Sequence, residues 1–79
     1  MKVRVLLFAS YADALGADSV VLDAPDGVTA AEVLALVQRR ITVPVPPRPM
    51  VAINASYAEG SDVVREGDEV AVIPPVAGG

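Results

Sequence analysis

The chain has 79 residues, enough for one domain, and 53% of them are apolar against 20% charged, a composition typical of a compact globule. It contains no cysteine and no histidine, which excludes thiolate nucleophiles, disulfides, the usual zinc sites and the commonest general base. A formal net charge of −4 disfavours nucleic acid and anionic membranes as partners, and no apolar run is long enough to span a membrane, so we expect a cytoplasmic protein.

The first part of the chain predicts two strands with a short helical turn between them. Residues 2–8 alternate between two faces, one of which is apolar throughout, so they predict a strand. The other face changes from charged to apolar at Leu6 and Phe8. A helical turn over residues 10–15 and a second strand over residues 19–23 follow.

The clearest local signal is Thr29-Ala30-Ala31-Glu32, a capping box in which the Thr29 hydroxyl and the Glu32 carboxylate satisfy backbone N–H groups at a helix start. The helix that begins there carries the i, i+3, i+4, i+7 spacing of a buried stripe. The stripe consists of Ala30, Val33, Leu34 and Val37. Beyond the helix, four of the seven residues 43–49 are proline, which predicts a stiff extended connector.

The remaining elements are strands. Residues 50–53, 56–57 and 69–73 have strand character and are separated by turn residues. The order strand, strand, helix, strand, short strand, strand predicts an α+β domain of the β-grasp type, in which a mixed sheet wraps around one main helix. We place this domain at residues 1–73 and a flexible C-terminal tail at residues 74–79.

Side-chain chemistry is sparse. Four carboxylates near the end of the chain match no ordered metal loop and are expected to be solvated turn residues; they are Asp62, Glu66, Asp68 and Glu69. Tyr11 and Tyr57 are expected to serve in packing. The isolated glycines form no phosphate-binding loop, so we expect neither a bound metal nor a bound cofactor, and no ATP binding by the chain itself.

The tail offers a different chemistry. Pro74 and Pro75 cannot extend a sheet and direct the backbone outward, while Gly78 and Gly79 carry no side chains. The six residues after Ile73 reach roughly 20 Å when extended, enough to enter a narrow channel in another protein. Adenylation by an ATP-dependent partner would make the terminal carboxylate a reactive acyl group, which sulfide or a persulfide could convert into a thiocarboxylate. Because glycine is also common at frayed ends, the two glycines alone are weak evidence.

A surface at the root of this tail is a second feature. In a β-grasp sheet the first and last strands lie side by side and parallel, so Phe8 would neighbour Ile73. Leu6 and Phe8 would then join Ile73, with Ala71, in an apolar patch on the sheet face away from the helix, where a partner could dock. The alternative is that the prolines or a loop cover these residues.

Three segments resemble the small subunit of molybdopterin synthase. They are residues 5–9, residues 51–54 and, most specifically, residues 66–79, which end in Ile73-Pro74-Pro75-Val76-Ala77-Gly78-Gly79. The resemblance implies a ubiquitin-like β-grasp fold and a sulfur carrier that is no enzyme on its own. The family pattern also assigns Phe8 and the residue before the prolines, Ile73, to subunit contact. Two departures are that the position of Ile73 is often aromatic in the family and that the connector 43–49 is unusually rich in proline.

The resemblance further implies a reaction sequence on Gly79. An activating enzyme related to ubiquitin activators would use ATP to adenylate the Gly79 carboxylate, and a sulfur donor such as a cysteine desulfurase or rhodanese would supply the sulfur. The loaded tail would then enter the large subunit of the synthase and give its sulfur to cyclic pyranopterin monophosphate, for molybdenum cofactor biosynthesis. The residues that would thread into the large subunit are Pro74, Pro75, Val76, Ala77 and Gly78.

Three other functions stay open from the sequence. A sulfur carrier for another pathway, such as thiamine thiazole synthesis, would share the Gly79 chemistry, although the Pro74-Pro75 pair argues against it. A ubiquitin-like protein modifier would be joined through Gly79 to target lysines; with Lys2 as its only lysine, it is poorly suited to self-linked chains. A plain interaction domain would give Gly79 no covalent role.

Overall fold

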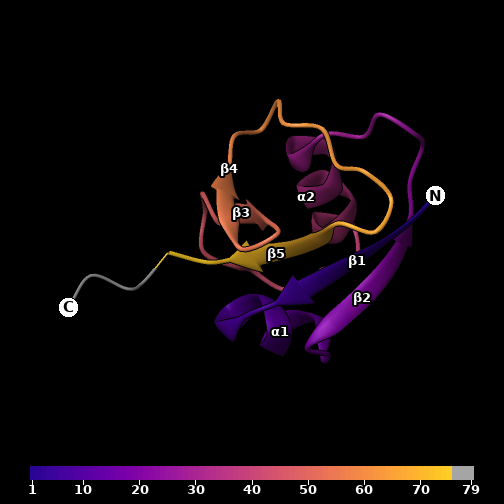
Figure 1. Cartoon of the computed structure of the whole chain (residues 1–79). Helices are drawn as coiled ribbons and strands as arrows, with labels where there is room; N and C mark the ends of the chain where they lie inside the picture. Colours follow the sequence, from indigo (N-terminus) through magenta and orange to yellow (C-terminus); the bar gives the residue numbers. More distant parts are fainter. Residues whose placement is uncertain (76–79) are drawn as a thin grey trace.

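The computed structural model describes residues 1–75, so the predictions made for Val76, Ala77, Gly78 and Gly79 lie outside the described residues. Five strands and two helices occur in the described part (Figure 1). Their bounds are β1 (Lys2–Leu7), α1 (Ala9–Leu15), β2 (Ser19–Asp23), α2 (Ala30–Gln38), β3 (Met50–Ile53), β4 (Ser56–Ala58) and β5 (Glu69–Ile73).

The strands form one mixed sheet. Their order is β2-β1-β5-β3-β4, with β1 and β5 parallel and every other neighbouring pair antiparallel. Helix α2 lies across one face of this sheet, and the short α1 follows the end of β1 (Figure 1). This arrangement confirms the predicted α+β fold of the β-grasp type.

Strand β1 is one residue shorter than predicted. The prediction carried the strand to Phe8, but the chain leaves the ladder after Leu7, because Ala9 adopts the left-handed backbone with φ 49°. Phe8, still extended at φ −126° and ψ 150°, becomes the residue that precedes α1. This reversal leaves the Phe8 side chain 46% exposed at the end of the sheet.

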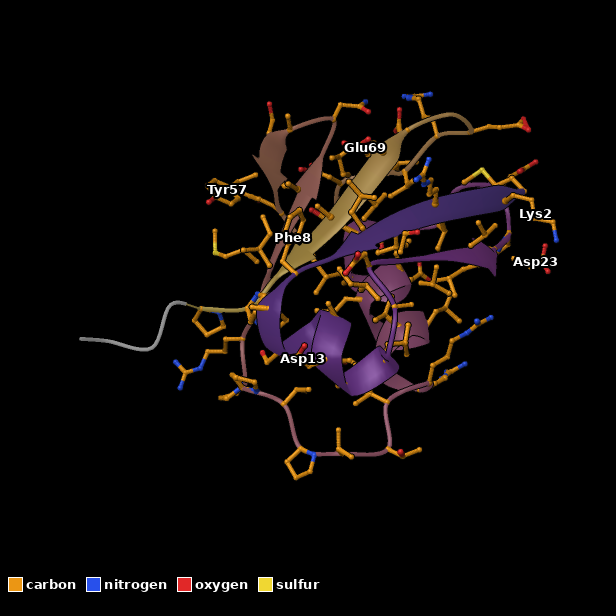
Figure 2. All side chains as sticks on the ribbon, turned by 90° about the horizontal axis from the view of Figure 1, so that it is seen from below. Lys2, Phe8, Asp13, Asp23, Tyr57 and Glu69 are labelled. Carbon is orange, nitrogen blue, oxygen red and sulfur yellow. The ribbon has the colours of Figure 1, made fainter. Side chains whose placement is uncertain are left out.

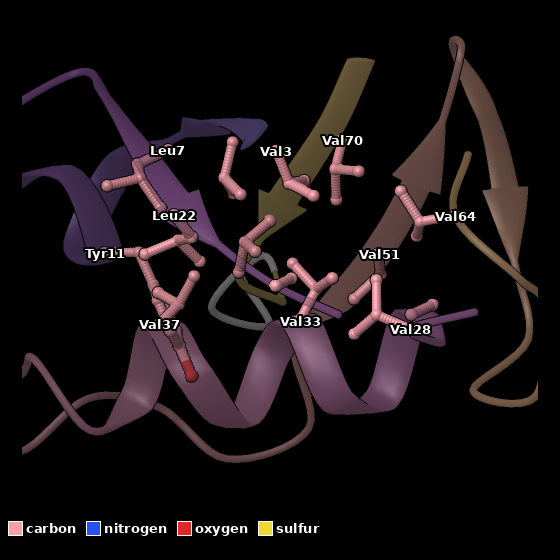
Figure 3. Packing of buried hydrophobic residues seen from close by; sticks show 14 residues of the cluster. Val3, Leu7, Tyr11, Leu22, Val28, Val33, Val37, Val51, Val64 and Val70 are labelled. Carbon is pink, nitrogen blue, oxygen red and sulfur yellow. The ribbon is translucent and has the colours of Figure 1, made fainter. Parts of the chain in front are cut away.

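Helix α2 begins where the capping box predicts. The Thr29 hydroxyl accepts a hydrogen bond from the Glu32 N–H at 3.3 Å, and the Glu32 carboxylate accepts one from the Thr29 N–H at 3.0 Å. Three of the four predicted stripe residues are fully buried, while Leu34 is half-buried. The buried three are Ala30, Val33 and Val37. Their contacts with the inner face of the sheet form the hydrophobic core (Figure 3).

Tyr11 closes one end of this core. It is fully buried on α1 and points toward α2, where its hydroxyl accepts a hydrogen bond from Gln38 Nε2 at 3.3 Å (Figure 3). A buried tyrosine needs such a partner for its hydroxyl. The structure therefore supports the packing role predicted for Tyr11, whereas Tyr57 is 70% exposed on β4.

Asn54 and Asp68 tie the β3–β4 turn to the start of β5. Asn54 and Ala55 have φ values of 51° and 67°, which favour a tight hairpin turn. The Asn54 amide donates to Asp68 Oδ1 at 3.0 Å, and the Arg65 N–H donates to Asp68 Oδ2 at 2.8 Å. The Glu69 N–H in turn donates to Asn54 Oδ1 at 3.0 Å. Asp68 is thus a turn residue, as predicted.

These bonds make the stability of the fold depend on pH through Asp68. The hydrogen bond from the Arg65 N–H, followed by that from Asn54, lowers the pKa of Asp68 below its ordinary value of 3.8. A carboxylate with a lowered folded pKa stabilises the fold above its unfolded pKa and loses that contribution as the pH falls through the folded value. We expect Asp68→Asn to lower the free energy of unfolding at neutral pH and to flatten its decline below pH 3.8. Urea titrations across the acid range measure this; Glu66→Gln in the same turn is the control, and an equally steep decline in both variants would contradict the prediction.

Candidate functional site at the end of the sheet

The parallel pairing of β1 with β5 brings the predicted docking residues together. In the observed register Leu6 lies opposite Ala71, and Leu7 lies opposite Val72. Phe8 is the residue after Leu7, and Ile73 is the residue after Val72. Both line the same surface pocket. The predicted adjacency of Phe8 and Ile73 is therefore present, on the sheet face away from α2.

The apolar surface is wider than the predicted patch. Ala52 lies opposite both Ala71 and Tyr57, and Met50 lies opposite Ile73, and residues directly opposite one another share a face of the sheet. Sequence reasoning missed Met50, Ala52 and Tyr57. We call the whole surface the tail-root patch; it consists of Leu6, Phe8, Met50, Tyr57, Ala71 and Ile73, together with Ala52, which is itself buried between its neighbours on this face.

The tail-root patch is open to a partner. Phe8 is 46% exposed, Met50 45% and Tyr57 70%, which are high values for large apolar or aromatic side chains. Exposed apolar side chains gathered on one face of a sheet in this way mark interaction sites. The alternative, that the prolines or a loop cover these residues, is wrong for Phe8, because Pro46 of the connector lines the pocket beside Phe8 without burying it.

The connector is anchored at this margin. Val45 packs against the core, and Pro46 joins Phe8 and Ile73 in lining an almost wholly apolar pocket of about 470 Å³. Pro74 and Pro75 also line this pocket at the point where β5 ends, as do Ala9 and Ser10 of α1. Residues 43–49 contain no helix or strand, as predicted, but one of them, Pro46, lines the site.

The prolines end the strand as predicted. β5 stops at Ile73, since Pro74 has no N–H with which to extend the ladder. Pro74 is still buried, whereas Pro75 is exposed. The chain therefore reaches the protein surface at Pro75, two residues after the end of β5. The described chain therefore ends at the tail-root patch.

Comparison with known proteins identifies the family. A model of the ThiS family matches residues 5–79, nearly the whole chain. The chain belongs to the ThiS family. It is 35% identical to the molybdopterin synthase sulfur carrier subunit of Drosophila erecta, over 100% of this chain and 92% of that one, which confirms the resemblance seen in the sequence.

Solved structures support the fold of this ThiS-family chain. SAMP1 from Haloferax volcanii superposes with a TM-score of 0.83 at 24% identity, with all of both chains covered. One chain of the complex of subunits 1 and 2 of the molybdopterin-converting factor from Helicobacter pylori gives a TM-score of 0.67 at 21% identity, again with all of both chains covered. At these identities the likeness concerns the fold.

The outer face of the sheet in this chain carries charged residues at the end away from the tail root. Lys2 Nζ lies 2.6 Å from Asp23 Oδ1, and the hydrogen bond and charge of Lys2 lower the pKa of Asp23. Arg4 lies opposite Glu69 in the register, between this ion pair and the apolar residues. Figure 2 shows Phe8 and Tyr57 at the opposite end of the sheet from Lys2 and Asp23. An apolar region that is depleted of charged residues and bordered by them is common at protein interfaces.

The described residues offer neither a metal site nor a membrane-spanning helix. Between residues 1 and 75, no three acidic side chains converge in a way that could hold a metal ion. No helix in the same range has the length and apolar character needed to cross a membrane.

Proposed function

We propose that this chain is the sulfur carrier of a molybdopterin synthase, donating sulfur from a thiocarboxylate on Gly79 to the molybdopterin precursor, cyclic pyranopterin monophosphate. The observation that carries the proposal is the full-length match to a molybdopterin synthase sulfur carrier subunit. The exposed tail-root patch, from which the Pro75–Gly79 segment continues, supports it as a docking surface. The chain would act in the cytoplasm, as one subunit of a heteromeric sulfurtransferase.

The proposed chemistry needs only the terminal carboxylate and partner enzymes. A Gly79 carboxylate oxygen attacks the α-phosphate of ATP on an adenylating enzyme, and pyrophosphate leaves. Sulfide delivered by a sulfur donor then attacks the acyl carbon; a C–S bond forms, the acyl C–O bond breaks, and AMP leaves with that oxygen. In the large subunit the thiocarboxylate sulfur forms a C–S bond to a carbon of the precursor, from which an oxygen group leaves. Water then hydrolyses the acyl C–S bond, which leaves the sulfur on the precursor and restores the Gly79 carboxylate.

The tail-root patch gives the large subunit a place to dock. Docking there would hold the chain where the tail enters a narrow channel, and such fixed orientation accelerates a reaction by removing translational and rotational freedom beforehand. The aliphatic Ile73 and the connector residue Pro46 would shape the contact. The same two features are the ones in which the chain departs from the general family pattern.

Intact-mass spectrometry of the protein purified from its native cell tests the proposal. We expect a fraction of molecules in which one terminal oxygen is replaced by sulfur, and loss of that fraction when the sulfur supply is removed. An unchanged carboxylate in cells that are actively making the cofactor would contradict it. The likeness to SAMP1 of Haloferax volcanii, a small archaeal modifier protein, makes a protein modifier the second candidate; a modifier would instead yield branched peptides that join Gly79 to target lysines.

A further inference from the structure

Only two amines in the chain could attack an activated carboxylate. Lys2 is the single lysine, and the other five basic residues are arginines. An arginine guanidinium remains protonated in proteins, so it is no acyl acceptor near neutral pH. The candidates are therefore the ε-amine of Lys2 and the α-amine of Met1.

Both amines already have partners at the start of β1. The Met1 ammonium donates to the Ala24 carbonyl at 2.7 Å, in a partly buried position. Lys2 Nζ lies 2.6 Å from Asp23 Oδ1. Because the Lys2 and Asp23 side chains are 72% and 79% exposed, this ion pair holds the amine only weakly. Position in the fold must therefore separate Lys2 from the tail.

The sheet register sets that separation. Lys2 lies five residues before Leu7, which is opposite Val72, and Pro75 lies three residues beyond Val72 in the same direction. At about 3.3 Å per residue, the Cα atoms of Lys2 and Pro75 are roughly 26 Å apart. Figure 1 shows β5 pointing away from the N-terminus.

The tail is too short to return over this distance. Four residues follow Pro75, and fully extended they span at most about 14 Å. The four-carbon stem of Lys2 adds roughly 6 Å of reach. The terminal carboxylate therefore falls short of the Lys2 amine, and it falls further short of the Met1 amine, which has no stem.

We propose that the fold prevents the activated Gly79 carboxylate from reacting with the chain's own amines. The chain can then give its acyl group only to a nucleophile that a partner supplies. The inference rests on the proposed function, in which Gly79 becomes an activated acyl group. Attack by an amine of the same chain would break the bond to the leaving group, form an amide, release a proton and close a dead-end ring. Keeping both amines at the far end of the sheet leaves the partner's sulfur nucleophile without an internal competitor.

The basic residue near the tail root is Arg48, whose side chain is not a nucleophilic amine. Met50 lies opposite Ile73, and Arg48 lies two residues before Met50 and two after Pro46, with a left-handed backbone at φ 58°. Pro46 lines the same pocket as Pro75, which places the connector at the tail root. A positive charge is present there, but an arginine carries it, so the tail root has no nucleophilic amine.

A semisynthetic thioester tests the proposal without any partner enzyme. The full chain is fused to a self-cleaving intein and released with a small thiol, which leaves a thioester on Gly79. It is compared with Arg48→Lys, which adds an amine at the tail root, and with Arg65→Lys, which adds one in the loop before β5 at the opposite end of the sheet. Intact mass is followed at low protein concentration and mildly alkaline pH, after circular dichroism has confirmed that all three proteins are folded.

We expect the unmodified chain and Arg65→Lys to hydrolyse to the free acid. Arg48→Lys should instead accumulate a product one water lighter than the acid, at least tenfold faster, with an isopeptide bond between Gly79 and position 48. Equal ring formation by the unmodified chain would overturn the proposal, and so would its absence from all three proteins. Because the thioester is made chemically, either result is separate from whether the cell loads Gly79 with sulfur.

Discussion

Deleting Gly79 is expected to abolish sulfur transfer while leaving the domain folded. The deletion moves the terminal carboxylate back by about 3.5 Å along the tail, and misplacing a reacting group by even 1 Å can cost about 100-fold in rate. We therefore expect transfer to fall by at least about 100-fold. The buried apolar core lies between Val3 and Val72, so the free energy of unfolding should not change.

The measurement is single-turnover sulfur transfer to the molybdopterin precursor, with activating enzyme and large subunit supplied. Ala77→Gly is the matched control, because it alters the tail without changing its length, and it should retain most of the transfer. Urea unfolding of both variants checks that the domain is intact. Transfer at the normal rate by the truncated chain would show that Gly79 does not carry the sulfur.

Most of the fold follows from local sequence signals. The strands at Ser19–Asp23, Met50–Ile53 and Glu69–Ile73 have the predicted bounds, because turn residues flank alternating or β-branched runs. The capping box fixes the start of α2 in the same way. The end of β1 was mispredicted because the reversal occurs at Ala9, a residue type that gives no warning of a left-handed backbone.

The candidate site was only partly predictable, because it depends on which strands become neighbours. Phe8 and Ile73 were found through the parallel pairing of the first and last strands. Met50 and Ala52 sit on a four-residue strand, too short for its outer face to be read from periodicity, and their place depends on β3 pairing with β5. Pro46 belongs to a segment without regular structure, so only tertiary packing could place it at the tail root.

The tail-root patch and the tail are expected to contribute to different steps. The patch determines how long the complex lasts, whereas the tail determines where the acyl carbon lies within it. A change in the patch should therefore weaken binding without altering the chemistry once the tail is in place. Phe8 is the residue best suited to separate the two effects, because it is large, central to the predicted contact and only half-buried.

We expect Phe8→Ala to weaken binding to the large subunit by about 10- to 100-fold, the usual range for truncating an aromatic residue at the centre of an interface. The free energy of unfolding should fall by at most about 1 kcal/mol, since the side chain is 46% exposed and loses little buried area. Titration calorimetry with the large subunit measures the dissociation constant, and urea unfolding measures the stability.

Val21→Ala is the matched control for this variant. Val21 is also an exposed apolar side chain on the outer face, at 56%, but it lies on the edge strand β2 opposite Arg4, away from the tail root. It should leave the dissociation constant within about twofold of the original, because truncations outside an interface core are close to neutral. Equal losses for the two variants would mean that the partner covers the whole outer face, and no loss for Phe8→Ala would place the docking surface elsewhere on the domain.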